Sequence, residues 1–167
     1  YTRILNTSEY SEIPQNRERT FMTCFLGEQD WNNKQIPEDE KVDRCPLTSL
    51  LHVNFPSKEE TSKKIQDLLE EEVDPRYYYT EEAYMHSELK EHMQRTDTIY
   101  QWRRKYVREN QSNRCPTLTA NMGTGGHNVP LIRTRDGRFR KLTPKECFFC
   151  QGYPKDISLP EVANCHL

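Results

Sequence analysis

The sequence predicts an α+β fold in which two strands near the amino-terminal end precede a helical insert and a small, mainly β module. Three observations predict it. An apolar run rich in β-forming residues, 21–26, follows Ile4–Leu5 and ends at Gly27. Helix-start signals and helical periodicity fall within residues 57–95. Short apolar segments separated by turn residues fill residues 98–139.

The first strand pair contains the most informative segment of the chain, Gln15-Asn16-Arg17-Glu18-Arg19. It leads into the run 21–26, which we expect to form a buried strand. On one extended segment Arg17 and Arg19 point to the same side, and Gln15 joins them. Such planar, fixed donors suit phosphate or a base edge. The alternative reading is a solvated surface cluster, which is the commoner fate of an arbitrary Arg-x-Arg pair.

Residues 28–56 carry several prolines and predict a linker. A helix is expected to begin at Ser57, because Ser57 and Glu60 form a Ser-x-x-Glu capping box. It should end at Asp74–Pro75. Its apolar face would consist of Ile65, Leu68 and Leu69.

A second helix is expected after Thr80, with Glu81–Glu82 in its first turn. Its apolar side would consist of Met85, Leu89 and Met93. Both helices belong to an acidic stretch, residues 59–97. The two helices therefore predict a helical pair with a charged outer face.

The module that follows has strand candidates at 98–110, 116–120, 129–133 and 138–142. Asp136–Gly137 is a strong hairpin signal between the last two. These features predict a small twisted β module.

The last helix has the clearest signals. Thr143 suits the N-cap, Pro144 the first helical position, and Glu146 completes a capping box. Gly152 suits the end of the helix. Cys147 and Cys150 would then be core thiols on one face. A zinc site that includes Cys165–His166 is the alternative, and no metal site is predicted.

Charge is distributed unevenly along the chain. The formal net charge is −2 and 30% of the 167 residues are charged, whereas 34% are hydrophobic. The net charge alone argues against a nucleic-acid binder, but residues 101–145 are strongly basic, and phosphate binding depends on local charge. Six scattered cysteines and the lack of a long apolar run lead us to expect a soluble protein of a reducing cytoplasm.

Three motifs occur in the order known from one enzyme family. The first is Gln15-x-Arg17-x-Arg19, within residues 1–27. The second is Thr117–Leu118 with a glycine loop, within 116–127. The third is Arg-x-Leu-Thr-x-x-Glu-Cys at 140–147, followed by Gly-Tyr-Pro at 152–154. Together they resemble the carboxy-terminal part of the DNA cytosine-5 methyltransferases. The resemblance covers both ends of the chain well and residues 30–98 hardly at all.

The resemblance implies a division of the chain. Residues 1–30 would end the catalytic domain and supply closing strands of its α/β, Rossmann-like sheet. Residues 31–139 would form the target-recognition domain, with a helical insert at about 57–95 and a β module at about 98–139. Residues 140–167 would be a helix and loop that join recognition and catalytic domains, ending before the family's last motif.

Several family motifs are absent from the sequence. They are the glycine-rich cofactor loop, the Pro-Cys nucleophile and the Glu-Asn-Val element. The resemblance thus implies that S-adenosylmethionine is bound mainly by parts outside this chain. The expected partners are double-stranded DNA and a catalytic chain or amino-terminal segment, in a prokaryotic, nucleoid-associated restriction-modification setting. The chain alone is expected to be inactive.

The resemblance also assigns site residues. Arg19 would reach the flipped cytosine, and Arg17 and Gln15 would hold the backbone and neighbouring loops. The pair Arg140 and Glu146 would hold the recognition module against the catalytic domain rather than take part in the chemistry. The DNA-binding set implied by the motifs and the basic stretch is Thr117, Leu118, Thr119, Asn121, Gly123, Thr124, Gly125, Gly126, His127, Arg103, Arg104 and Arg108.

Other readings remain open at this point. The protein could be a non-catalytic DNA-binding or specificity subunit, a zinc-stabilised module, or a related RNA methyltransferase. The glycine loop could cradle a phosphate, but no Lys-Ser/Thr follows it. The helical pair could shape a DNA cleft, but its acidic residues would repel phosphates, which favours a solvated structural insert.

Overall fold

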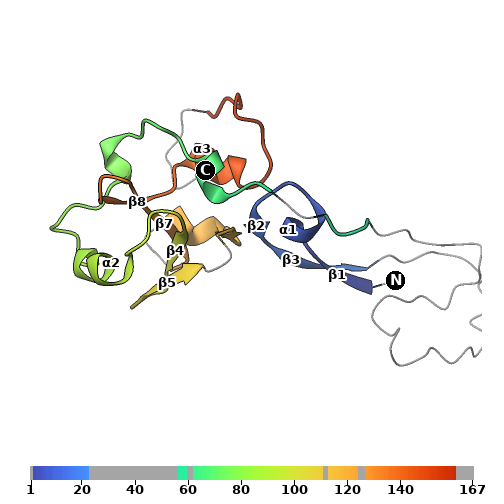
Figure 1. Ribbon diagram of the computed structural model, residues 1–167, viewed down its shortest axis with the longest axis horizontal. Helices are drawn as coiled ribbons and strands as arrows, with labels where there is room; N and C mark the ends of the chain where they lie inside the picture. The colour runs from blue at the N-terminus through green and yellow to red at the C-terminus, as the bar shows by residue number, and fades with distance from the viewer. Residues whose placement is uncertain (1, 23–55, 60–61, 111–112, 124–126, 161–167) are drawn as a thin grey trace, which may run out of the picture.

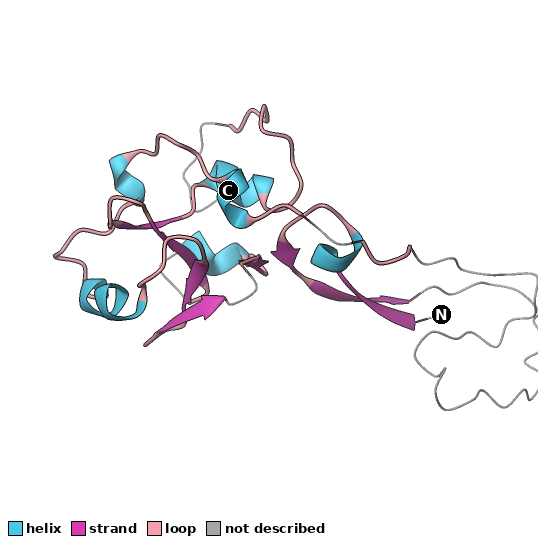
Figure 2. Ribbon diagram, viewed as in Figure 1, coloured by secondary structure: helices cyan, strands magenta, loops and turns pink. Residues whose placement is uncertain are grey.

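The computed structural model describes residues 2–22, 56–59, 62–110, 113–123 and 127–160. Within them the fold is mixed α/β, with short helices and small sheets. Figure 1 shows the amino-terminal hairpin projecting to one side of a β module, and Figure 2 shows that strands form the centre of that module, with the helices around it. The expected linker, 28–56, lies almost wholly outside the described residues.

The amino-terminal unit is a hairpin closed by a short helix. Strand β1 (Thr2–Asn6) pairs antiparallel with β3 (Glu18–Met22), so that Leu5 lies opposite Arg19. Helix α1 (Thr7–Tyr10) follows β1, and the side chain of its N-cap, Asn6, accepts from the Ser8 N–H. The expected strand-loop-strand arrangement is therefore confirmed, with a helical turn in the loop.

Two expectations for this unit are wrong. Every residue of β3 is exposed, including Phe21 and Met22, so the described part of the run 21–26 is not a buried strand. Gln15 and Arg19 also do not share one continuous strand. Gln15 belongs to β2 (Gln15–Asn16), which pairs in parallel with β6 (Cys115–Pro116), because the chain leaves one ladder at Arg17 and enters another.

The β module is a four-stranded antiparallel sheet in the order β5-β4-β7-β8. Its strands are β4 (Ile99–Trp102), β5 (Val107–Asn110), β7 (Val129–Arg133) and β8 (Phe139–Lys141). The strand candidates 129–133 and 138–142 are confirmed. The hairpin signal is confirmed too: Gly137 has φ +86°, a conformation that glycine adopts readily.

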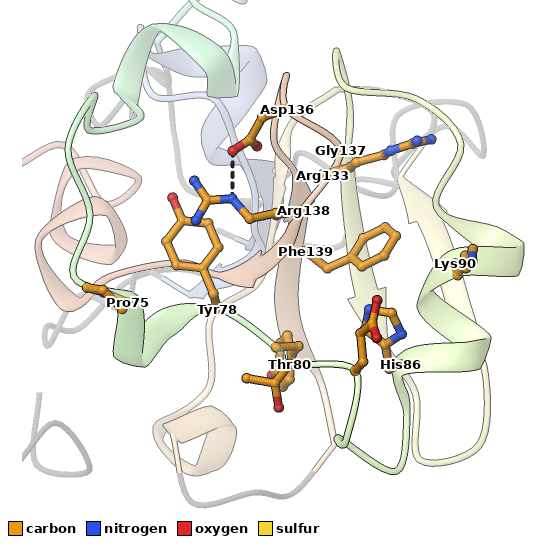
Figure 3. Close-up of a pocket in the computed structure, with 12 residues that line it drawn as sticks. Pro75, Tyr78, Thr80, His86, Lys90, Arg133, Asp136, Gly137, Arg138 and Phe139 are labelled. Atoms are coloured by element: carbon orange, nitrogen blue, oxygen red, sulfur yellow. Dashed lines mark hydrogen bonds and ion pairs between the residues drawn. The ribbon is translucent and has the colours of Figure 1, made fainter.

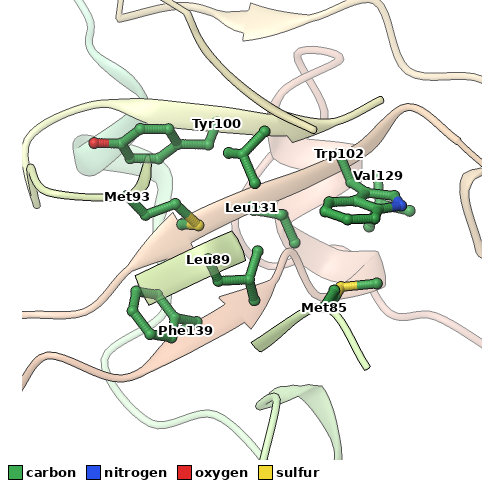
Figure 4. Packing of buried hydrophobic residues seen from close by; sticks show 9 residues of the cluster. Met85, Leu89, Met93, Tyr100, Trp102, Val129, Leu131 and Phe139 are labelled. Carbon is green, nitrogen blue, oxygen red and sulfur yellow. The ribbon is translucent and has the colours of Figure 1, made fainter. Parts of the chain in front are cut away.

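One face of this sheet packs against α2 (His86–His92), which contributes Leu89 to a nine-residue core (Figure 4). The predicted apolar side, Met85, Leu89 and Met93, is buried as expected. The predicted start after Thr80 is wrong. Residues 81–85 form turns instead, with Ala83 N donating to Thr80 O and His86 N to Ala83 O.

The opposite face packs against α3 (Pro144–Phe149), whose predicted caps are all confirmed. Thr143 and Glu146 form a reciprocal capping box. The end of the helix is closed by Gly152 N donating to Phe149 O and Tyr153 N to Phe148 O, the hydrogen bonds of a Schellman motif. Gly152 has φ +90°, and a Cβ there would lie 2.6 Å from Ile13 Cδ1. Gly152 thus ends the helix and leaves room for Ile13 of the amino-terminal unit.

The core on this face contains Ile99, Ile132 and three buried thiols, Cys115, Cys147 and Cys150. Cys147 and Cys150 are core thiols, as expected. Burial raises the pKa of the Cys147 thiol, so it stays protonated at neutral pH.

The helix expected from Ser57 to residue 73 is wrong. The described part of this segment contains only a 3-10 turn, Ile65–Leu68. Tertiary contacts compete with the helix. Ile65 is fully buried in the core beside α3, and Glu70 N donates to Glu146 Oε1 at 2.9 Å rather than to a helical carbonyl. A helical pair is therefore not formed.

The strand candidate 116–120 is also wrong beyond Pro116. The Thr117 hydroxyl donates to Asn16 O at 2.9 Å, and the chain then turns into a 3-10 helix, Ala120–Gly123. The Met122 N–H donates to Thr119 O within this turn. Contact with the amino-terminal unit therefore ends the strand early.

Candidate functional site

Two recesses in the described residues contain charged or polar side chains. The first, of about 530 Å³, lies between the β7–β8 turn, α2 and residues 75–81 (Figure 3). Both arginines that line it already have hydrogen-bond partners within the protein. Arg138 Nε lies 2.6 Å from Asp136 Oδ2, as the dashed line in Figure 3 shows. Arg133 Nη1 donates to the carbonyls of Met93 and Gln94, at the end of α2. These groups stabilise the turn and the helix end.

The second recess, of about 270 Å³, is lined almost entirely by polar side chains and is called the polar recess below. Its lining residues are Asn16, Gln101, Arg103, Arg108, Asn110, Pro116, Thr117, Thr119 and Asn128. They come from the amino-terminal unit, the β4–β5 hairpin, β6 with the segment after it, and the residue before β7. The fold therefore brings together groups from four separate parts of the sequence.

One wall of the polar recess is the β4–β5 hairpin. Antiparallel pairing places Gln101 directly opposite Arg108, so both side chains are on the same face of the sheet. The hairpin closes with Arg103 N donating to Tyr106 O at 2.8 Å. Arg104 takes the left-handed conformation, φ +64°, in this turn.

The other wall is the short parallel ladder between β2 and β6. Its register sets Asn16 opposite Pro116, and the hydrogen bond from the Thr117 hydroxyl to Asn16 O fixes the next residue. Arg114 ties the same two parts together, because its Nη1 donates to the buried Ser8 Oγ at 2.9 Å. The Gln-x-Arg-x-Arg segment thus adjoins the β module at this recess.

The arginines of the polar recess are held by neutral groups. Gln101, only 3% exposed, accepts at Oε1 from Arg103 Nη1 at 3.3 Å and from Arg108 Nη2 at 3.1 Å. Asn128 Oδ1 accepts from Arg103 Nη1 at 2.7 Å. Among the described residues no carboxylate pairs with either guanidinium. The recess therefore keeps a double positive charge that favours an anionic or acceptor-rich ligand.

The predicted DNA-binding residues are partly gathered here. Arg103, Arg108, Thr117 and Thr119 line the polar recess, whereas Arg104 is exposed on the hairpin turn and does not line it.

The remaining predicted residues lie around the same end of the module. Leu118 packs against the core beside α3. Asn121 and Gly123 belong to the 3-10 turn, and half-buried His127 immediately precedes Asn128. Thr124, Gly125 and Gly126 lie outside the described residues.

The predicted catalytic residues differ in exposure. Gln15 is 2% exposed, and its Nε2 has no hydrogen-bond partner in the described part of the chain. Arg17 is half-buried and held through its backbone, because its N–H donates to Asn6 Oδ1 and its carbonyl accepts from Thr7 N. Arg19 is exposed, and its Nη1 donates to the neighbouring Glu18 carbonyl at 2.6 Å.

Sequence reasoning missed Gln101, Asn128, Asn16 and Asn110 as lining residues. Pairing residues 99–102 with 107–110 as a hairpin would have placed Gln101 beside Arg108. That hairpin carries no Asn-Gly or Asp-Gly signal, because Arg104 rather than a glycine takes the left-handed position. Asn128 has a left-handed φ of +70°, which asparagine tolerates, but its partner Arg103 is distant in sequence.

Two negative observations apply to the described residues only. They contain no group of three or more His, Cys, Asp or Glu side chains that could hold a metal ion. They also contain no helix whose length and apolar character would let it cross a membrane.

Comparison with known proteins gives the family. The model of the C-5 cytosine-specific DNA methylases matches residues 1–163. The Type II methyltransferase M.Bsp6I of Bacillus sp. (strain RFL6) is 48% identical over 99% of this chain and 47% of its own length. The Type II methyltransferase M.DsaV of Dactylococcopsis salina is 30% identical over 98% of this chain and 40% of its own length.

The chain thus spans about half the length of the curated relatives it matches, or less. No solved structure gives a significant match. The match of the family model along nearly the whole chain nevertheless leaves no ambiguity: the chain belongs to the C-5 cytosine-specific DNA methylase family.

Proposed function

We propose that this chain is the DNA-recognition part of a DNA (cytosine-5)-methyltransferase of a restriction-modification system. The complete enzyme would transfer a methyl group from S-adenosylmethionine to a flipped cytosine in a specific duplex sequence. The observation that carries the proposal is the polar recess, where the Gln-x-Arg-x-Arg segment meets two cationic side chains of the β module. Membership of the family and the names of the Type II methyltransferase relatives support it.

The recess is suited to DNA on chemical grounds. DNA presents phosphate oxygens and base-edge acceptors, and both pair with guanidinium groups. Arg103 and Arg108 keep their charge because their partners are carboxamides. The hydroxyls of Thr117 and Thr119 lie on the same recess and add groups that can contact phosphate or sugar. The polar recess would accordingly contact the duplex.

The amino-terminal unit would contribute to the base-flipping site. Arg19 is exposed, and only one of its guanidinium nitrogens has a hydrogen bond to the Glu18 carbonyl. In this proposal its other donors contact the extruded cytosine. Arg17 and Gln15 would position this segment, and the unpartnered Nε2 of Gln15 would donate to a group of the completed enzyme.

The hairpin also offers a docking face for the rest of the enzyme. Ile4, Phe21 and Met22 are 58%, 49% and 73% exposed, although they are large and apolar. Burying them in a larger sheet would stabilise the assembly by the hydrophobic effect. We propose that β1 and β3 complete the Rossmann-like catalytic sheet. The partner would be a segment that carries the Pro-Cys nucleophile, on the same polypeptide or on a second chain.

The recess does not suit the cofactor. S-adenosylmethionine carries a positive sulfonium, and two guanidiniums without a carboxylate partner among the described residues would repel it. The proposal therefore assigns cofactor binding to the rest of the enzyme.

The proposal is tested by mixing duplex DNA and labelled S-adenosylmethionine with this chain, with the remaining segment of the enzyme, or with both together. Methyl incorporation should require both. Incorporation by residues 1–167 alone would refute the division of roles. Sequence-specific binding without transfer in any combination would instead indicate a non-catalytic specificity subunit.

The role of Arg19 can be tested separately in the complete enzyme. Arg19→Ala should reduce methyl transfer far more than DNA affinity, because the extruded base is bound only after the duplex. Equal losses in transfer and affinity would show that Arg19 only contacts phosphate.

A further inference from the structure

We infer that Gln101 is a positioning residue that presents Arg103 and Arg108 to a guanine of the recognised duplex sequence. The inference rests on the proposed function and goes beyond it, because it names both the base and a residue that would not itself contact DNA. The observation behind it is that one buried carboxamide oxygen holds two guanidinium groups.

Holding two guanidinium groups on one acceptor costs free energy. Two like charges that converge on one neutral acceptor repel each other, and no carboxylate in the described residues relieves this repulsion. A ligand that supplies acceptors relieves this repulsion, so the arrangement favours the complex over the free protein. Two other arginines of the same module are arranged differently. Arg140 and Arg138 each pair with a carboxylate.

The shared acceptor is held rigidly. Gln101 lies in β4, between β5 and β7, and is 3% exposed, so its side chain is fixed by packing. Asn128 holds Arg103 from a second direction at 2.7 Å. Contacts with phosphate tolerate mobile side chains, whereas bidentate reading of a base edge requires the guanidinium plane to be oriented beforehand. The buried acceptor therefore favours base reading.

The guanidinium donors of the recess match one base better than the others. Guanine presents two acceptors, O6 and N7, side by side in the major groove, and arginine is their commonest partner. Adenine and cytosine place an amino donor at that edge, which would face the N–H groups of the arginine. The recess therefore favours guanine over these bases.

The test uses the complete enzyme that contains this chain and begins by mapping its site from the cytosines that it methylates. Each guanine of that site is then replaced by 7-deazaguanine, which loses the N7 acceptor but keeps base pairing and phosphates. Binding is measured by fluorescence anisotropy. For the unmodified enzyme we expect one position at which 7-deazaguanine weakens binding about ten- to 150-fold, the range that corresponds to the loss of one hydrogen bond to a charged group.

At that position the penalty should vanish in Arg108→Ala, whose exposed side chain makes folding a minor concern. It should shrink in Gln101→Leu, which removes the shared acceptor but keeps a buried apolar side chain. Lys105→Gln is the matched control, because it removes an exposed charge from the same turn and Lys105 does not line the polar recess. Its 7-deazaguanine profile should match that of the unmodified enzyme.

The inference fails if Arg108→Ala weakens binding equally on all duplexes, leaves every 7-deazaguanine penalty unchanged, and lowers the slope of log affinity against log salt by about 0.9. That pattern would identify a phosphate contact. It also fails if no 7-deazaguanine position weakens binding. If no methylated site can be mapped, the proposed function itself fails, which separates the two results.

Discussion

Arginines in two regions of this molecule are held in opposite ways. Arg140, 2% exposed, makes a bidentate ion pair with Glu146, which is fully buried, at 2.8 Å for both hydrogen bonds. Arg103 and Arg108 share the neutral oxygen of Gln101 at the polar recess. The first arrangement neutralises the charge and fixes α3 to β8. The second keeps the charge available, which is what a binding surface needs.

The Glu146 carboxylate has further partners, which makes it the centre of a network. It accepts from the backbone N–H groups of Glu70 and Thr143. The Thr143 hydroxyl in turn donates to Glu70 Oε2 at 2.6 Å. These contacts join α3, β8 and the segment around Glu70, while the expected role of Arg140 and Glu146 in holding the recognition module against the catalytic domain stays a prediction.

The largest effect is expected from Glu146→Ala. It leaves the buried Arg140 unpaired and removes acceptors from two backbone N–H groups, so the free energy of unfolding should fall by about 3–5 kcal/mol. Urea denaturation followed by circular dichroism measures it. Glu88→Ala, which removes an exposed carboxylate beside His92, is the control and should change stability little. A small loss for Glu146→Ala would contradict the contrast between the two regions.

Gln101→Glu should give the arginines of the polar recess a carboxylate partner, as Glu146 is for Arg140. A carboxylate between Arg103 and Arg108 would relieve their repulsion, so stability should be unchanged or raised. DNA affinity of the complete enzyme should fall by about tenfold or more, roughly 1.4 kcal/mol, because the guanidiniums gain an internal partner. Anisotropy titration measures it, and unchanged affinity would show that the recess does not contact DNA.

The double variant Arg103→Ala, Arg108→Ala separates binding from folding. Its free energy of unfolding should fall by about 1–3 kcal/mol, less than for Glu146→Ala, because the buried Gln101 oxygen loses both donors but no ion pair is broken among the described residues. DNA affinity should nevertheless fall. A loss of stability comparable to that of Glu146→Ala would mean that these arginines are structural after all.

The smallest effect is expected from Arg138→Gln. Arg138 is exposed, pairs with Asp136 and lies 4.3 Å over the Tyr78 ring at the first recess. Exposed ion pairs contribute little to stability, and this arginine lies away from the polar recess. Neither unfolding nor DNA binding should change measurably, so a marked loss of DNA affinity would direct attention to the first recess instead.

Local signals were sufficient for some elements and insufficient for others. The caps of α3 and the Asp136–Gly137 hairpin were predicted residue by residue, because the residues that decide them are neighbours in sequence. The helix expected from Ser57 had a capping box as well. This helix does not form, because burial of Ile65 in the core and the hydrogen bond from Glu70 N to Glu146 both compete with helical hydrogen bonding in the segment.

The site shows the same division. The sequence supplied four DNA-binding candidates that line the recess, Arg103, Arg108, Thr117 and Thr119. They could be predicted because their motifs and local charge can be recognised in the sequence itself. The neutral acceptors Gln101 and Asn128 were not predicted, because their importance depends on which side chains meet across the sheet.

By itself the sequence determined the family, through three motifs in order, and the short elements whose hydrogen bonds stay within a few residues. Only the tertiary structure decided which arginines are neutralised and which keep their charge. The reason is physical: the environment of a guanidinium is set by acceptors within about 3 Å, and these come from strands and turns that the chain brings together only when the sheet forms.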